Sequence, residues 1–431
     1  MLRAFAQAFR TPDLRTKLLF TLGIMALFRL GSVLPTPGVN LTNVQQCIGQ
    51  SQDAGLLGLV NIFSGGALLQ LSVFALGIMP YITASIIIQL LRVVIPRFEE
   101  LHKEGQSGTA KLTEYTRYLT IGLGVLQSAT IVATAANGQL FPTCKGTDII
   151  PSASPVNLAL MIVTMTAGTG LIMWLGELIT EKGIGNGMSL LIFTSIVARF
   201  PQNMASVIGG PRGTSKFLAI ITVVLLATLA VVFVEQATRR IPVQYAKRMI
   251  GRRQYGGSTT YIPIKINTAG VIPVIFASSI LSVPQLVAQF GDRSSGWVQW
   301  IQTNLQQTQP IYLAAYGVLI LFFTFFYTAI TFDAAEISDN MKKYGGFIPG
   351  VRAGEPTSRY LSYVINRVTT AGSLYLVVLA LLPTLAVIWL GLSQHLPFGG
   401  TTILIMVGVG LQTVKEINSQ LQQRHYEGFL S

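Results

Sequence analysis

Charged side chains are scarce in this sequence. Only 11% of its 431 residues are Asp, Glu, Lys or Arg, whereas 51% are hydrophobic. An average soluble domain carries about 25% charged residues, so this chain cannot cover a soluble surface of the usual kind. An ordinary cytosolic enzyme and a disordered chain are therefore excluded, and two cysteines are too few for a disulfide-rich secreted domain. The composition predicts an all-α membrane protein.

Histidines and membrane-embedded charges are also few. The three histidines, His102, His395 and His425, fall in predicted loops or in the tail. Only Arg29 lies plainly within an apolar run, near its outer end, where a long side chain can reach the membrane surface. Ionisable residues at membrane depth usually mark ion pathways, and none of the catalytic or metal-binding patterns occurs there. Two alternatives, an intramembrane protease and an ion-coupled small-molecule transporter, need polar or charged residues at membrane depth. The sequence therefore does not support them.

Long apolar runs, in contrast, are abundant. A helix needs about 20 mainly apolar residues to cross a bilayer. With a cytosolic N-terminus, most of the 30 Lys and Arg residues fall on the cytosolic side, as the positive-inside rule requires. The sequence therefore predicts ten spans with both termini in the cytosol. The predicted spans are 18–35, 68–95, 117–137, 155–178, 187–207, 217–237, 266–290, 311–333, 366–391 and 400–418.

The segment ahead of the first span is basic and amphipathic. Leu2, Phe5 and Phe9 recur at helical spacing among basic residues. Such a pattern predicts a short helix on the inner membrane surface, where anionic lipids stabilise it.

Two segments of the chain match one another. Gly77–Ser85 in the second predicted span and Gly270–Ser278 in the seventh share Gly, Pro, Ile, Ala and Ser without a gap. With five spans in each half, 1–212 and 213–431, the two segments run in opposite directions, which is typical of an inverted repeat. A chance match is the alternative, because short apolar sequences that contain Gly and Pro are common in membrane helices. Their equivalent positions favour the repeat, with an interrupted second span that faces a protein interior.

The interrupted spans carry aliphatic side chains at helical spacing. Ile78 and Ile82 are four residues apart, and Val271 and Ile275 repeat this spacing. An apolar constriction can hold back water and ions by dewetting, without any charge. Ordinary core packing is the alternative for each isoleucine alone.

The apolar stretch at about 56–67 is too short to span a membrane. Ser64, Gly65 and Gly66 separate it from the second span. It is either a re-entrant half-helix on a glycine hinge or a static external loop.

Two long cytosolic loops, 238–265 and 334–366, are basic. The positive-inside rule and lipid contact explain their charge but not their length. Long basic projections also dock on RNA phosphates or on an acidic protein surface.

The two cysteines, Cys47 and Cys144, fall in predicted external loops. A disulfide could form there in an oxidising compartment. Two unpaired thiols are the alternative, because sequence does not show whether the two residues meet.

Four long motifs resemble the SecY family of protein-conducting channels. They are Ser72–Leu91, Trp174–Gly187, Arg239–Val243 and Phe347–Arg352. The resemblance covers essentially the whole chain. It implies two inverted halves of five helices around an hourglass pore, which conducts unfolded preproteins and releases signal or transmembrane helices laterally into the cytoplasmic membrane of a bacterium.

The resemblance also implies roles for individual residues. The apolar pore ring is Ile78, Ile82, Ile192, Ile275, Ile280 and Ile405. The plug is Leu57, Leu59, Val60, Asn61, Ile62, Phe63, Ser64, Gly65 and Gly66. The polar residues of the lateral gate, between the second and seventh spans, are Thr83, Gln89 and Asn267. Contacts with the SecA motor or the ribosome are Arg239, Arg240, Arg252, Arg253 and Arg352.

Partners follow from the same resemblance. SecE and SecG are expected as further subunits, and signal peptides, preproteins and anionic lipids as ligands. The channel is expected to be no enzyme and to need no cofactor, because SecA, translation or the proton-motive force supplies the energy. A disulfide between Cys47 and Cys144 would join the segment that leads into the plug to the loop after the third span.

Overall fold

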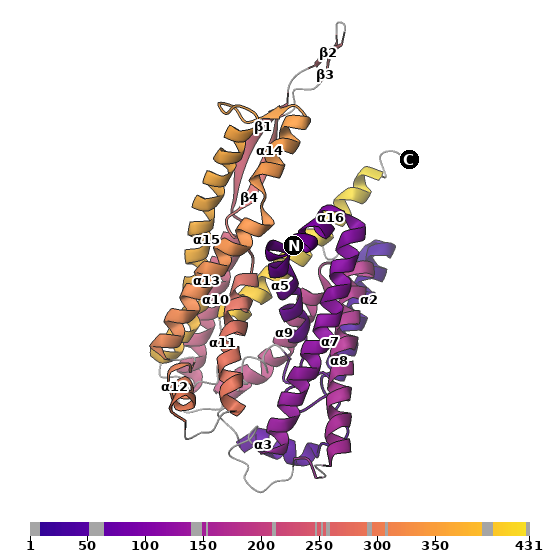
Figure 1. The fold of residues 1–431 in the computed structure, drawn as a ribbon, viewed down its shortest axis with the longest axis vertical. Coiled ribbons are helices and arrows are strands. Elements are labelled where there is room, and N and C mark those ends of the chain that lie inside the picture. Colours follow the sequence, from indigo (N-terminus) through magenta and orange to yellow (C-terminus); the bar gives the residue numbers. More distant parts are fainter. Residues whose placement is uncertain are drawn as a thin grey trace. The chain divides into compact units, whose positions relative to one another are not determined.

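Helices form most of the chain, and they group into two units (Figure 1). The computed structural model describes residues 9–50, 64–138, 149–151, 154–208, 213–245, 248–250, 253–255, 259–290, 295–306, 309–389 and 400–427. The first unit comprises 1–220, 389–397 and 405–431, and the second comprises 221–388 and 398–404. Three of the four boundaries lie within helices, namely α10 (Gly213–Gln236), the last residues of α15 (Glu355–Trp389) and α16 (Gly400–Glu427). The expected halves, 1–212 and 213–431, remain a prediction.

The first unit is built from closely packed helices. A Cβ on Gly168 would lie 2.1 Å from the Val73 carbonyl oxygen, and one on Gly187 would lie 1.9 Å from that of Gly176. Glycine is therefore required where α8 meets the segment before α5 and where it meets α9. The helices are α2 (Pro12–Gly31), α3 (Leu41–Gln50), α5 (Met79–Val94), α6 (Pro96–Lys103), α7 (Gln106–Ala136), α8 (Pro155–Lys182) and α9 (Gly187–Ile208).

The second unit combines helices with a small sheet. Strands β1 (Thr238–Tyr245) and β4 (Thr259–Lys265) pair antiparallel, and β5 (Gly346–Phe347) pairs with the other edge of β1. Ile241 and Val243 alternate with exposed residues along β1 and pack against α14 and α15. The remaining elements are β2 (Arg248–Ile250), β3 (Arg253–Tyr255), α11 (Ile272–Phe290), α12 (Gly296–Asn304), α13 (Pro310–Thr331), α14 (Ala334–Lys343) and α15 (Glu355–Trp389).

Several helices have the length and composition of membrane spans. Among the described residues, four qualify, namely Gln106–Ala136, Pro155–Lys182, Pro310–Lys343 and Glu355–Leu385. The pair α5 and α6, bent by 101° at Ile95, adds a fifth if it is one span. Shorter apolar helices cover Gly187–Pro201, Ile220–Gln236 and Ile272–Gln285. A mostly helical chain with several apolar helices is thus confirmed, while the count of ten spans remains a prediction.

The first part of the second predicted span is not helical. Residues 68–78 form turns, and the helix begins only at Met79. Pro80 therefore lies in the first turn of α5, where its missing N–H costs nothing, and does not break a continuous helix. The second matching segment has the same local structure: Gly77 and Gly270 have φ of 57° and 64°, and Pro273 is the second residue of α11.

Candidate functional site

Two arginines converge on the turn that follows the predicted plug. Arg29 Nη1 donates to the Gly65 carbonyl oxygen at 2.9 Å, and Arg199 Nε donates to the same oxygen at 3.0 Å. Arg29 Nη1 also lies 3.3 Å from the Ser32 hydroxyl. Both guanidinium groups are half-buried. Arg29 thus binds the protein backbone as well as lying near the end of its helix.

The turn itself depends on glycine. Gly65 and Gly66 have φ of 65° and 89°, in the left-handed region that glycine adopts without strain. A Cβ on Gly66 would lie 1.3 Å from Arg199 Nη2, so the guanidinium occupies the space that glycine leaves. Ser64, Gly65 and Gly66 are all buried. The other predicted plug residues, Leu57, Leu59, Val60, Asn61, Ile62 and Phe63, lie outside the described residues.

The segment between this turn and α5 is hydrogen-bonded to the residues that follow α2. Thr36 Oγ1 donates to the Leu71 carbonyl oxygen at 2.8 Å, and the Val73 N–H donates to Leu34 at 2.9 Å. Leu71 is fully buried although its φ of 46° is unusual for a residue with a side chain. These contacts fix the chain from Ser64 to Ile78 and therefore fix where α5 begins.

The predicted pore residues are mostly buried. Ile78, Ile192, Ile275 and Ile405 are buried, Ile82 is half-buried, and Ile280 is exposed. Ile78, Ile82, Ile192 and Ile405 belong to the first unit, and Ile275 and Ile280 to the second. The ring that the six would form remains a prediction.

The polar gate residues differ in how they are held. Thr83 Oγ1 donates to the Met79 carbonyl oxygen of its own helix at 3.0 Å, and Gln89 is half-buried on α5. Asn267 is buried in the turn between β4 and α11, where its Nδ2 donates to Glu235 Oε1 at 2.7 Å. Sequence reasoning missed Glu235, because nothing in the sequence places it beside Asn267.

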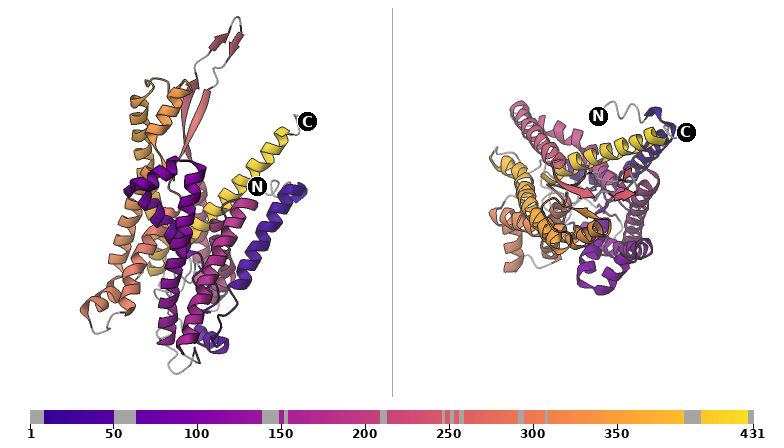
Figure 2. Two further views of the ribbon diagram at one scale, coloured as in Figure 1. Left: turned by 45° about the vertical axis from the view of Figure 1, so that its right-hand side comes forward. Right: turned by 90° about the horizontal axis from the view of Figure 1, so that it is seen from above.

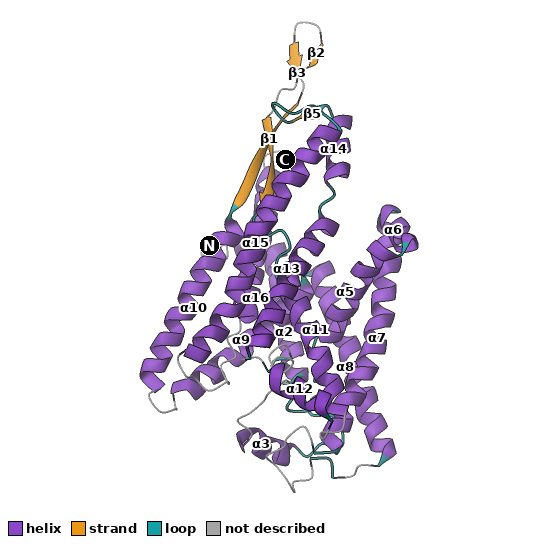
Figure 3. Ribbon diagram, turned by 60° about the vertical axis from the view of Figure 1, so that its left-hand side comes forward, coloured by secondary structure: helices purple, strands orange, loops and turns teal. Residues whose placement is uncertain are grey.

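The two basic loops form one structured surface. The pairing of Gln244 with Phe347 and of Tyr245 with Gly346 joins them through β1 and β5. Arg239 and Arg240 are exposed on β1. Figure 3 draws β1 as an orange strand. The alternation of Ile241 and Val243 with polar residues is the sequence signal for this strand.

A second hairpin extends the basic surface. β2 and β3 pair antiparallel, with Ile250 opposite Arg253, and they project beyond β1 and β4 in Figure 1 and in the left view of Figure 2. Arg253 thus lies on β3, while Arg252 lies outside the described residues.

Arg352 lies in an ordered turn of the same unit. Its carbonyl oxygen accepts from Thr357 Oγ1 at 2.8 Å, and the Gly354 carbonyl oxygen accepts from Ser338 Oγ at 2.6 Å. The Arg352 side chain is exposed. The turn is therefore held by its backbone, which leaves the guanidinium available for a partner.

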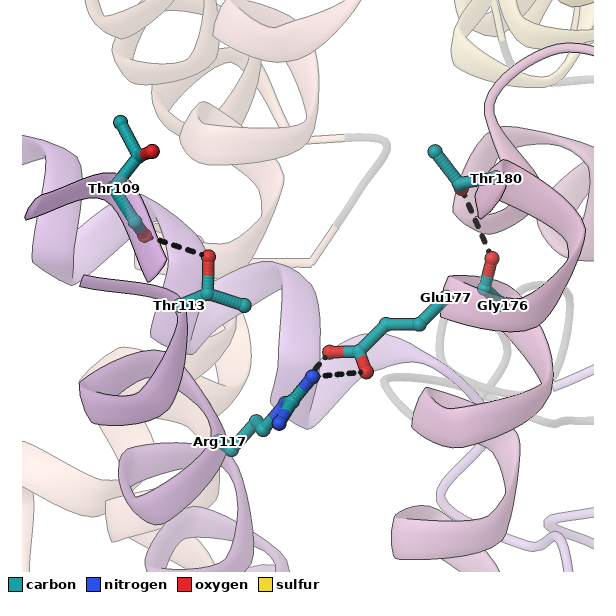
Figure 4. Close-up of polar contacts among 6 residues, drawn as sticks. All are labelled: Thr109, Thr113, Arg117, Gly176, Glu177 and Thr180. Carbon is teal, nitrogen blue, oxygen red and sulfur yellow. Dashed lines mark hydrogen bonds and ion pairs between the residues drawn. The ribbon is translucent and has the colours of Figure 1, made fainter. Parts of the chain in front are cut away.

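The motif Trp174–Gly187 has a structural role in α8. Arg117 on α7 and Glu177 on α8 form a two-pronged ion pair, with Nε–Oε1 and Nη2–Oε2 distances of 3.0 and 2.7 Å (Figure 4). Thr180 Oγ1 donates to the Gly176 carbonyl oxygen and accepts from the Gly187 N–H at 2.9 Å. Charge and glycine packing thus join α7, α8 and α9.

Cys47 lies within the apolar core of the first unit. Its side chain is fully buried among residues such as Leu68 and Leu71, and it is disulfide-bonded. Cys144 lies outside the described residues, as do Leu2 and Phe5 of the N-terminal segment. The pairing of Cys47 with Cys144 remains a prediction.

Similarity to known proteins extends along almost the entire chain. The SecY family profile matches residues 72–414. The protein translocase subunit SecY of Streptomyces scabiei is 62% identical over 438 residues, which cover 100% of both chains. A solved protein-conducting channel has a TM-score of 0.63 at 19% identity and covers 94% of this chain and 91% of its own. The idle yeast Ssh1 complex, bound to the yeast ribosome, has a TM-score of 0.62 at 15% identity, with coverages of 93% and 89%.

Proposed function

The chain belongs to the SecY family of protein translocase subunits, and we propose that four of its parts carry out separable steps of protein conduction. The chain is a channel and not an enzyme. The observation that carries this function is the 62% identity to a protein translocase subunit over the full length of both chains. The four parts are the interior isoleucines, the glycine turn under the two arginines, the polar residues of the lateral gate, and the basic surface of the second unit.

The isoleucines seal the channel. Ile78, Ile82, Ile192, Ile275, Ile280 and Ile405 form an apolar ring, which water does not wet when no polypeptide is present. The equivalent places of Ile82 and Ile275, each two residues after the proline in the first turn of α5 or α11, support this role. An apolar ring makes no selective hydrogen bond, so it fits any passing side chain.

The glycine turn anchors the plug. Residues 57–66 close the external side of the ring, and the bonds from Arg29 and Arg199 to Gly65 support an anchored closed state. Displacing the plug would break both charge-assisted hydrogen bonds, each stronger than a neutral one. Opening therefore requires an incoming chain.

The lateral gate lies between α5 and α11, with Thr83, Gln89 and Asn267 as its polar residues. An apolar signal sequence partitions into lipid through the open gate, because hydrocarbon favours its side chains. The polar residues set how hydrophobic a signal must be before it enters.

The basic surface docks the partner that supplies the chain. Arg239, Arg240, Arg252, Arg253 and Arg352 contact the SecA motor or the phosphates of ribosomal RNA. The exposure of Arg239, Arg240 and Arg352 on one unit supports this assignment, as does the likeness to a channel complex bound to a ribosome.

The protein is a multi-pass subunit in the cytoplasmic membrane of a bacterium, with ten spans and both termini in the cytosol. SecE and SecG complete the channel, and anionic lipids contact the N-terminal segment. The buried, disulfide-bonded Cys47 pairs with Cys144, the only other cysteine of the chain.

Reconstitution tests the proposal. The chain, SecE and SecG are placed in vesicles, and SecA, ATP and a preprotein are added. We expect the preprotein to become protected from protease only when ATP is present. Absence of protection together with flux of a small solute would contradict conduction of polypeptides and favour a transporter.

A further inference from the structure

Glu235 and Asn267 form a partly buried polar contact at the start of α11. Glu235 is the penultimate residue of α10, and Asn267 follows β4. Asn267 Nδ2 donates to Glu235 Oε1 at 2.7 Å, and the Asn267 residue is 3% exposed. A bond from a buried amide to a carboxylate is about twice as strong as one between neutral groups.

The sheet brings these two residues together. Thr238 pairs with Lys265 at the end of the β1–β4 ladder, and the Ile266 N–H donates to the Ala237 carbonyl oxygen at 3.2 Å. The strands therefore hold the end of α10 beside the turn that precedes α11. The contact is a fixed consequence of strand register and not a chance approach of two flexible side chains.

Asn267 also determines how the turn enters α11. Its Nδ2 donates to the Gly270 carbonyl oxygen at 3.2 Å, and Gly270 has a φ of 64°. The Val274 and Ile275 N–H groups then bond to the Val271 carbonyl oxygen in the first turn of the helix. The Asn267 amide thus connects the carboxylate of Glu235 to the start of the predicted gate helix.

Among the described residues, the other hydrogen-bond acceptor of this amide is the Gly270 carbonyl oxygen, which carries no charge. α15 packs closely over the turn, since a Cβ on Gly372 would lie 2.4 Å from the Ile266 carbonyl oxygen. The buried Asn267 Oδ1 and the Tyr375 hydroxyl have no hydrogen-bond partner in the described part of the chain. Removing the carboxylate would therefore leave one more buried polar group without a strong partner, which is costly.

We propose that Glu235 is a positioning residue of the lateral gate, which holds Asn267 and so sets the threshold that a signal sequence must exceed to enter. This inference rests on the proposed function. Loss of the carboxylate weakens the closed arrangement of the turn before α11. A weaker closed arrangement admits signal sequences that the native channel rejects.

The test compares two preproteins in the reconstituted complex. One has its native signal sequence, and the other carries a charged residue within the apolar part of the signal. The measured quantity is the ratio of the two translocation rates, defective over native. A change in the amount of folded channel cancels in this ratio. The matched control is Glu181→Ala, which removes an exposed carboxylate at the inner end of α8.

For Glu235→Ala we expect the ratio to rise about tenfold, as expected for the loss of about 1.5 kcal/mol from one hydrogen bond to a charged group. Glu235→Gln retains an acceptor and should stay within about threefold of the native ratio, because neutral bonds are roughly half as strong. Glu235→Ala should have no further effect when Asn267 is already alanine, because the contact is then absent.

A reversed pair adds a rescue that needs no alanine variant. Asn267→Asp places two carboxylates together and should relax selection. Combining it with Glu235→Gln restores a hydrogen bond, now from the introduced glutamine amide to the introduced carboxylate, and should restore the native ratio. Failure of this rescue, or a Glu235→Ala ratio equal to that of Glu181→Ala, would overturn the inference. If the native chain translocates neither preprotein, the proposed function fails instead.

Discussion

Replacing Gly66 with alanine should loosen the plug anchor. Gly66 has a φ of 89°, and an added Cβ would lie 1.3 Å from Arg199 Nη2. The arginine is long and flexible, so it can move away, but it then loses its bond to the Gly65 carbonyl oxygen. The variant therefore combines a backbone cost with a lost hydrogen bond.

The two contributions can be separated. A left-handed conformation costs a residue with a Cβ about 1 to 2 kcal/mol. Loss of a hydrogen bond to a charged group costs about 1.5 to 3 kcal/mol. Gly138→Ala provides the matched control, because Gly138 has a φ of 66° with nothing within 4 Å of the added Cβ. Relative to this control, Gly66→Ala should shift the plug equilibrium toward the open state by about tenfold to a hundredfold.

Ion leak through idle channels measures this shift. Vesicles that contain the native chain, each single variant and the Gly66→Ala/Arg199→Ala double variant are compared without preprotein. Arg199→Ala alone should reproduce most of the leak of Gly66→Ala. When Arg199 is already alanine, adding Gly66→Ala should raise the ion leak no more than Gly138→Ala raises it in the native chain. A Gly66→Ala leak equal to that of Gly138→Ala would refute the reasoning.

Three further predictions concern the seal, the first unit and the docking surface. Ile82→Asn should raise idle ion leak, because a polar side chain lets water wet an apolar constriction; unchanged conductance would favour ordinary core packing. Arg117→Ala and Glu177→Ala should each destabilise the detergent-solubilised protein. Because the ion pair is partly exposed to solvent, the coupling energy between the two substitutions should be only about 0.5 to 1 kcal/mol, which thermal denaturation of the single and double variants measures. Arg352→Glu should slow SecA or ribosome binding about tenfold or more, as expected for reversal of a steering charge, whereas membrane insertion stays native; equal losses in both measurements would indicate misfolding.

Local sequence signals predicted several parts of the structure well. Hydrophobic runs located the apolar helices, because burial of the backbone in a membrane leaves helices as the main solution. Gly77 and Pro80 marked the interruption before α5, since positive φ and a missing N–H are properties of single residues. The part of the predicted span before Gly77 is not helical, and Pro80 begins α5 because proline fits the first turn of a helix.

Contacts between distant residues were not predictable in the same way. Arg199 and Arg29 meet at Gly65 because three segments far apart in the sequence pack together. Glu235 meets Asn267 only through the register of β1 with β4, which a sequence does not state. The pairing of the two basic loops depends likewise on tertiary packing, although the alternating pattern around Ile241 favoured a strand.

The ladder between β1 and β4 mechanically couples the end of α10 to the start of α11. One strand continues from α10, the other leads within a few residues to α11, and seven paired positions keep the strands from sliding past one another. A displacement of β1 is therefore shared by β4. We infer that a partner docked on β1 would move the start of α11 without touching it.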